Sequence, residues 1–145
     1  MTLLISISIF ILDQLTKTSI KYLIAVGDSI PVIKDVFHIT LVFNKGAAFG
    51  ILKTQNSFFI IIAVVAAIFI VYSLPRLKKD EFFVNTAFSL LLGGIFGNLI
   101  DRLRFGYVID FLDFRIWPVF NVADCAISIG AALVAIHLLR LKFKR

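Results

Sequence analysis

The run from Ser57 to Leu74 constrains the fold more than any other feature, because its 18 residues include no charged side chain. As an α-helix, such a run is roughly 27 Å long, which is close to the hydrocarbon thickness of a bilayer. A backbone surrounded by lipid must satisfy its own hydrogen bonds, and a run of this kind does so as a helix. Pro75 follows and ends the helix. The sequence therefore predicts a membrane-spanning helix over 57–74.

Three further apolar stretches predict that the chain crosses the membrane four times. The composition is 60% hydrophobic and only 17% charged, and a soluble domain of 145 residues could not bury so much apolar surface. We expect an all-α membrane protein in which residues 1–145 form a single integral membrane domain. The first stretch has no basic segment before it and no small-residue cleavage site after it, so we read it as a retained helix. The expected helices cover about 2–26, 57–74, 82–102 and 122–141.

The segment of about 27–56, between the first two helices, is predicted to hold a small β element. Residues 31–43 are rich in Val, Ile, Phe and Thr and alternate imperfectly, which is typical of a strand or hairpin. Asn44, Lys45 and Gly46 follow as a turn. We expect this element to lie on the extracytoplasmic side.

The basic residues predict the orientation of the helices. They concentrate between the second and third helices and at the C-terminal end, and the positive-inside rule places both regions in the cytoplasm. Both termini are then cytoplasmic, and the net charge of +6 reflects topology, so we expect no nucleic-acid partner. The residues that carry this prediction are Arg76, Lys78, Lys79, Arg140, Lys142, Lys144 and Arg145.

Polar side chains within the apolar stretches are costly in lipid and point to function. Asp13 and Lys17 lie four residues apart and can pair on one helical face, which a structural ion pair explains as well as chemistry does. Asn98, Asp101 and Arg102 also have the spacing of a shared helical face, near the outer end of the third helix. Helix capping and packing remain an alternative for Asn98 and Arg102.

Two further carboxylates lie at the same membrane face. Asp110 stands between apolar neighbours in a segment that reads as extended or re-entrant, and Asp124 lies in the first turn of the fourth helix, three residues after Asn121, a candidate N-cap. Helix capping alone would explain Asp124. The second isolated carboxylate, Asp110, at the same membrane face favours a functional pair over capping. In a partly desolvated pair one carboxyl keeps its proton. Such a pair can activate water with one member and protonate a leaving amine with the other.

Other peptidase chemistries fit the sequence poorly. There is no HExxH or G-x-S-x-G motif, and His38 and His137 are far apart in the sequence. Cys125 points about 100° away from Asp124 on a helix, and we interpret it as a packing residue. We therefore expect no metal and no cofactor.

Five segments, in this order, resemble the motifs of the bacterial lipoprotein signal peptidases (signal peptidase II), and the resemblance extends over nearly the whole chain. The segments are Asp13-Gln14-Leu15-Thr16-Lys17, Phe43-Asn44-Lys45-Gly46-Ala47-Ala48-Phe49-Gly50, Gly97-Asn98-Leu99-Ile100-Asp101-Arg102, Val108-Ile109-Asp110-Phe111 and Phe120-Asn121-Val122-Ala123-Asp124. Each motif is weak alone, and the five in order are specific.

The resemblance implies an aspartyl endopeptidase of the bacterial cytoplasmic (inner) membrane with its active site at the extracytoplasmic face. It would remove signal peptides from prolipoproteins by cleaving before the diacylglyceryl-modified cysteine, with Asp110 and Asp124 as the catalytic pair. The implied partners are the lipid-modified precursor and membrane phospholipid, and we expect a monomer. Residues expected to support the site or contact substrate are Asp13, Lys17, Asn44, Gly46, Asn98, Asp101, Arg102 and Asn121.

Two other functions stay open on the residues alone. Asp13, Lys17 and Asp101 could line the relay of a small transporter or proton-coupled channel. Gly93 and Gly97 form a small-xxx-small face that could serve a non-catalytic assembly partner.

Overall fold

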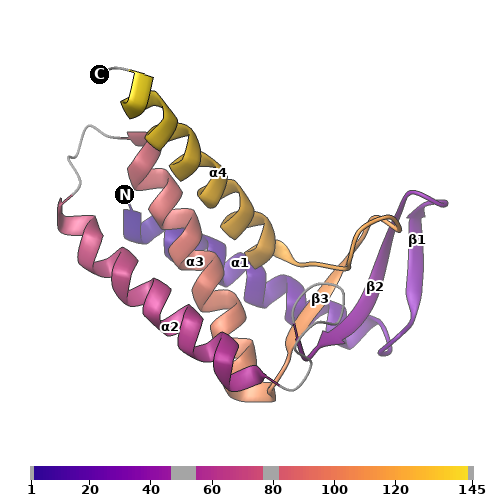
Figure 1. Ribbon diagram of the computed structural model, residues 1–145. Helices are drawn as coiled ribbons and strands as arrows, with labels where there is room; N and C mark the ends of the chain where they lie inside the picture. Colours follow the sequence, from indigo (N-terminus) through magenta and orange to yellow (C-terminus); the bar gives the residue numbers. More distant parts are fainter. Residues whose placement is uncertain (1, 47–54, 77–81, 144–145) are drawn as a thin grey trace.

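The computed structural model describes residues 2–46, 55–76 and 82–143, which form long helices and one small sheet (Figure 1). Within these residues, 4 helices are long and apolar enough to cross a membrane. The expected four-helix membrane protein with a small β element is confirmed. In chain order the elements are α1 (Thr2–Leu23), β1 (Ser29–Ile33), β2 (Phe37–Asn44), α2 (Asn56–Ser73), the 3₁₀ turn η2 (Leu74–Arg76), α3 (Phe82–Phe105), β3 (Val108–Asp113) and α4 (Val122–Phe143).

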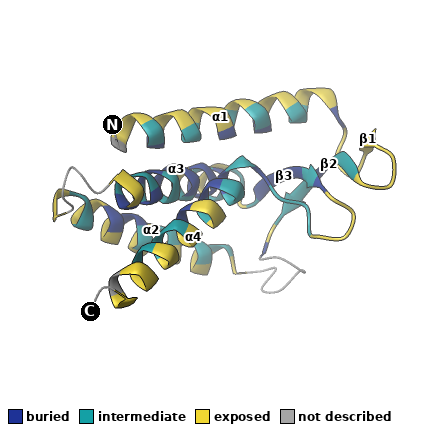
Figure 2. Ribbon diagram, turned by 90° about the horizontal axis from the view of Figure 1, so that it is seen from above, coloured by how far each residue is buried: buried dark blue, intermediate teal, exposed yellow. Residues whose placement is uncertain are grey.

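Helix α3 is the centre of the bundle and packs against each of the other three long helices. Burial is concentrated along α3, whereas α1, α2 and α4 present exposed surfaces on their outer sides (Figure 2). In α2, only Ala67 and Ile70 are buried, and Ile70 and Leu92 belong to one apolar cluster. The exposed apolar surface of α2 suits a helix whose solvent is lipid.

Small residues let the helix backbones approach one another closely. A Cβ placed on Gly93 would lie 2.7 Å from the Ser6 carbonyl oxygen of α1, and one placed on Gly94 would lie 2.5 Å from the Ala123 carbonyl oxygen of α4. Neither position has room for a side chain, so glycine sets the distance from α3 to both neighbours. The close approach predicted for Gly93 therefore occurs inside the chain.

Two helix ends differ from the expected boundaries for local reasons. Helix α1 stops at Leu23, because Gly27 turns the chain with φ of 92° and donates its N–H to the Leu41 carbonyl oxygen of β2. Helix α3 continues to Phe105, three residues beyond the expected end. Gly106, with φ of 76°, then caps it by donating its N–H to the Arg102 carbonyl oxygen.

The sheet consists of three antiparallel strands in the order β1-β2-β3. The expected strand or hairpin is the β1–β2 hairpin, which turns at Asp35 with φ of 60°. Strand β3, which precedes α4, pairs with β2 and places Val42 opposite Asp110. The sheet lies at the end of the bundle opposite the chain termini (Figure 1).

Candidate active site

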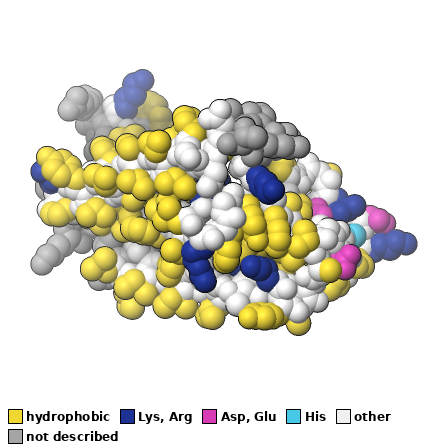
Figure 3. Space-filling view, turned by 90° about the horizontal axis from the view of Figure 1, so that it is seen from below, with side chains coloured by type: hydrophobic (Ala, Val, Ile, Leu, Met, Phe, Trp, Pro, Cys, Tyr) yellow, Lys and Arg dark blue, Asp and Glu magenta, His cyan; other side chains and the backbone are white. Residues whose placement is uncertain are grey.

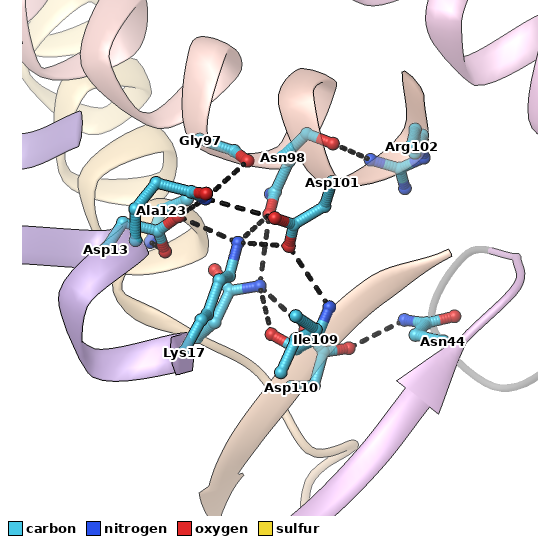
Figure 4. Close-up of polar contacts among 12 residues, drawn as sticks. Asp13, Lys17, Asn44, Gly97, Asn98, Asp101, Arg102, Ile109, Asp110 and Ala123 are labelled. Carbon is cyan, nitrogen blue, oxygen red and sulfur yellow. Dashed lines mark hydrogen bonds and ion pairs between the residues drawn. The ribbon is translucent and has the colours of Figure 1, made fainter. Parts of the chain in front are cut away.

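A buried lysine organises the carboxylates at the sheet end of α1 and α3. The Lys17 ammonium lies 2.8 Å from Asp13 Oδ2 and 2.9 Å from Asp101 Oδ2, and it donates a hydrogen bond to Asn98 Oδ1 at 3.0 Å. Figure 4 shows Lys17 reaching from α1 toward these groups on α3. Lys17, Asp13 and Asp101 are each at most 1% exposed. The positive charge of Lys17 and the negative charges of Asp13 and Asp101 therefore offset one another within the bundle.

Asp13 and Asp101 also tie separate elements together. Asp13 Oδ1 accepts the Ala123 N–H at 2.9 Å, at the start of α4. Asp101 Oδ2 accepts the Ile109 N–H at 3.2 Å, in β3 (Figure 4). Both carboxylates thus satisfy backbone donors that would otherwise be buried without partners. This geometry fits the supporting role expected for Asp13 and Asp101.

Asp110 lies on β3, is 1% exposed, and has an amide donor on each oxygen. Asn44 Nδ2 donates to its Oδ2 at 2.8 Å, and Asn121 Nδ2 donates to its Oδ1 at 2.7 Å. Asn44 is itself fixed, because its Oδ1 accepts the Gly46 N–H at 3.0 Å. Gly46 therefore orients the asparagine that contacts Asp110, whereas residues 47–50 of the same predicted motif lie outside the described residues.

Asp124 and Asn121 cap the start of α4 reciprocally. Asp124 Oδ2 accepts the Asn121 N–H at 3.2 Å, and Asn121 Oδ1 accepts the Asp124 N–H at 2.9 Å. Asn98 Nδ2 donates to the other Asp124 oxygen at 2.7 Å. The capping interpretation of Asp124 is therefore correct in its geometry, and it accounts for one of the two carboxylate oxygens.

Asn121 connects the two candidate catalytic carboxylates directly. Its side chain donates to Asp110, and its backbone N–H donates to Asp124. Its Nδ2 also lies 3.1 Å from Asn98 Oδ1, the oxygen that accepts from Lys17. The structure thus brings Asp110 and Asp124 to one site, with Asn98 and Asn121 between them and the lysine network behind.

The two carboxylates of β3 differ in their protonation. Burial and the nearby Asp124 carboxylate raise the pKa of Asp110 to about 7, although hydrogen bonds from Asn44 and Asn121 act in the opposite direction. Burial also acts to raise the pKa of Asp113, but the Thr40 hydroxyl and Arg115 outweigh it and hold this pKa below its usual range. Asp110 is therefore the carboxyl of this strand that is ready to exchange a proton near neutral pH.

Arg102 makes side-chain contacts on the α2 side of α3. Its guanidinium lies 5.0 Å from the centre of the Phe59 ring of α2, and one of its nitrogens is 3.5 Å from the Asn98 carbonyl oxygen. Consecutive helical residues point about 100° apart, so Asp101 faces α1 while Arg102 faces α2. Arg102 nevertheless lies within electrostatic range of Asp124, Asp110 and Asp101. The expectation that Asn98, Asp101 and Arg102 act from one face therefore stays a prediction for Arg102.

Gln14 contributes to the site and was missing from the predicted set. Its Nε2 lies 3.0 Å from Asp101 Oδ1 and 3.2 Å from both Asp13 Oδ2 and the Gly97 carbonyl oxygen. The available signal was an amide side chain inside an apolar helix, beside Asp13, which is costly in lipid without partners.

The described residues contain no group of three or more His, Cys, Asp or Glu side chains placed to hold a metal ion. Cys125 is half-buried on α4 as a free thiol. The site is thus a set of carboxylates and amides arranged around one buried ammonium.

Comparison with known proteins identifies the family of this chain. The family model described as Signal peptidase (SPase) II matches residues 5–140. The lipoprotein signal peptidase of Halothermothrix orenii is 47% identical over 138 residues, covering 95% of this chain and 94% of the relative. That of Brevibacillus brevis is 50% identical over 133 residues, covering 90% of this chain and 89% of the relative.

A solved structure has the same fold. It is described as a bacterial membrane enzyme determined by the in meso method at 2.3 Å resolution, and it superposes with a TM-score of 0.87 at 40% identity. The match covers 96% of this chain and 87% of that structure. These findings confirm the resemblance seen in the motifs and favour a peptidase over a transporter or an assembly partner. The chain belongs to the signal peptidase II family and is a membrane-bound peptidase.

Proposed function

We propose that this peptidase removes signal peptides from prolipoproteins by aspartyl chemistry, with Asp110 and Asp124 as the catalytic pair. The observation that carries the proposal is the pairing itself: the buried Asp110 and the half-buried Asp124, which come from different elements, share Asn121. In the reaction, the Asp124 carboxylate takes a proton from water, whose oxygen attacks the scissile carbonyl carbon. Asp110 supplies the proton that the leaving amine needs when the C–N bond breaks.

The surroundings of Asp124 support a lipid-modified substrate. A cavity of about 620 Å³ opens beside Asp124, and its other lining residues include Phe114, Trp117, Phe120 and Ile129. This volume is in the range of small-molecule sites, and an apolar wall next to a carboxylate suits a hydrocarbon group attached close to the cleaved bond. We therefore place the diacylglyceryl group of the precursor cysteine here, with cleavage on the N-terminal side of that cysteine.

The first experiment is cleavage of a synthetic diacylated precursor peptide by the detergent-solubilised protein. We expect cleavage immediately before the modified cysteine, no cleavage of the same peptide without its diacylglyceryl group, and no loss of activity with a metal chelator. Cleavage that is indifferent to lipidation would contradict the proposed substrate, and strong inhibition by the chelator would contradict the metal-free pair.

The pH dependence tests the roles assigned to the pair. Since the pKa of Asp110 is raised to about 7, this carboxyl is protonated below neutral pH and loses its proton above it. We therefore expect kcat/KM to fall above pH 7 by about tenfold per pH unit. A rate that rises from pH 7 to pH 9 would contradict the role of Asp110 as proton donor.

A variant sharpens this test. Asn44→Ala removes a hydrogen bond that lowers the pKa of Asp110, so the falling limb of the profile should move to higher pH. Thr40→Ala removes a hydrogen bond from Asp113 instead and should leave that limb in place.

We further propose that the site faces the extracytoplasmic side of the bacterial cytoplasmic membrane, with both termini in the cytoplasm. Arg140 and Lys142, near the end of α4, support this orientation, since the sheet lies at the other end of the helices. Asp110 is on β3 of that sheet, and Asp124 is in the first turn of α4. In a Cys125→Ser background, an impermeant thiol reagent should label Lys34→Cys but not Lys142→Cys on intact spheroplasts. The reverse pattern would overturn the orientation.

A further inference from the structure

An apolar groove runs between α1 and α3, away from the carboxylates. It has a volume of about 380 Å³, and its lining includes Leu3, Ile7 and Phe10 of α1 with Phe96, Ile100 and Leu103 of α3. Phe96 and Asn98 point about 200° apart on the helix, so the groove and the catalytic pair lie on different sides of α3. The groove is therefore a second feature, separate from the site described above.

The chemistry of the groove suits hydrocarbon. Ser6 is the one lining residue with a polar side chain, and its hydroxyl donates to the Ser89 carbonyl oxygen at 3.0 Å. Along α3 the groove extends from Leu92 to Leu103, a rise of roughly 17 Å, which is close to the thickness of one leaflet's hydrocarbon. A helix about 10 Å wide and of that length occupies roughly 1,300 Å³. The smaller cavity is better matched by a single extended chain.

Two cations lie at the sheet end of this groove. The Lys21 ammonium is 4.3 Å and the Arg104 guanidinium 5.1 Å from the centre of the Phe105 ring. Arg104 is the residue after Leu103, which lines the groove. On α1 the groove lining ends at Phe10, and Lys21 lies roughly three turns further toward the sheet. Lys21 is placed near Arg104 by the Phe105 ring, which both cations contact.

Neither cation has an ion-pair partner among the carboxylates of the described residues. Among the residues that the structure describes, the ion pairs of this protein involve Lys17 and Arg115. Lys21 is also 5.8 Å from the centre of the Phe43 ring, so aromatic rings hold its ammonium in place. The two charges remain available to an anion at the depth where lipid phosphates lie.

We propose that the groove and its two cations form a binding site for an anionic phospholipid of the leaflet in which the sheet lies. One acyl chain occupies the groove, and the phosphate contacts Lys21 and Arg104. Figure 3 shows the molecule from below, where broad hydrophobic areas have Lys and Arg side chains among them. An apolar channel that ends at cations has the polarity of a phospholipid.

The cation arm of the test measures lipid binding by the full-length protein in detergent, using phosphatidylglycerol and phosphatidylcholine in native mass spectrometry. The double variant Lys21→Gln/Arg104→Gln should bind phosphatidylglycerol about 30-fold more weakly than wild type, since each cation near a membrane surface contributes a several-fold gain. Lys34→Gln/Lys142→Gln removes the same net charge elsewhere and should bind as wild type does. Equal binding by the two double variants would overturn the proposal.

The groove arm uses a matched pair of substitutions on α1. Ile7 and Ile11 are 52% and 48% exposed, and only Ile7 lines the groove. Ile7→Trp should fill the groove and weaken phosphatidylglycerol binding, whereas Ile11→Trp should not. Similar binding by both variants, or displacement of the lipid by glycerol phosphate, would overturn the proposal, because the acyl chain would then have no part in recognition. Both arms measure binding, so they do not depend on the proposed catalytic pair.

Discussion

Asp110→Asn and Asp124→Asn are each expected to give a folded protein that cleaves the diacylated precursor peptide at least about 10³-fold more slowly than wild type. An asparagine has nearly the shape of an aspartate, and its oxygen can still accept one of the hydrogen bonds from Asn98 or Asn121. It can neither take a proton from water nor deliver one to the leaving amine. The measurement is single-turnover cleavage with enzyme in excess.

Asp113→Asn is the matched control for this prediction. Asp113 lies on the same strand as Asp110 and is also buried, at 5% exposed, but it bonds Thr40 and Arg115. This variant should retain most of its activity, even though it loses part of a local hydrogen-bond network. Normal processing by either Asp110→Asn or Asp124→Asn, at wild-type thermal stability, would remove that residue from the catalytic pair.

Lys17→Met is expected to lower the free energy of unfolding by about 3–5 kcal/mol, because it leaves Asp13 and Asp101 buried without their cation. The loss should appear as a large fall in the midpoint of thermal unfolding in detergent. Lys21→Met is the matched control, since Lys21 lies one turn away on α1 and contacts aromatic rings. It should unfold close to the wild-type midpoint.

A second variant tests the reason for this loss. In Lys17→Met/Asp101→Asn one of the two orphaned charges is also removed, so part of the lost stability should return. If Lys17→Met unfolded like Lys21→Met, or if the double variant were less stable than Lys17→Met, the buried ammonium would not be the balancing charge of the bundle.

The parts of the fold that depend on local pattern could be predicted from the sequence. An uncharged apolar run forms a helix in lipid whatever surrounds it, and the i, i+4 pairing of Asp13 with Lys17 follows from helix geometry alone. Asp101 and Arg102 show that spacing along a helix does not predict which neighbouring helix a side chain contacts. Both lie within one turn of Asn98, yet one faces α1 and the other α2, and only the packing of the bundle decides this.

Contacts between distant segments could not be predicted from periodicity. Asn44 and Asp110 are 66 positions apart and meet because β2 pairs with β3. Asn121 reads as a helix cap in the sequence, and it is one, but its position between the two carboxylates depends on how β3 and α4 are placed by α3. The motifs identified these residues as a set, and the tertiary structure supplies their geometry.

The ion pair within α1 also bears on how the protein is made. Asp13 and Lys17 belong to the same helix and lie 2.8 Å apart, so α1 carries its own counter-ion before any later segment exists. Helix α1 can therefore enter the bilayer with the Lys17 ammonium already paired. When α3 follows, Asp101 adds a second carboxylate to the Lys17 ammonium, which is already paired with Asp13. The ammonium therefore has a counter-ion in lipid at every stage of assembly.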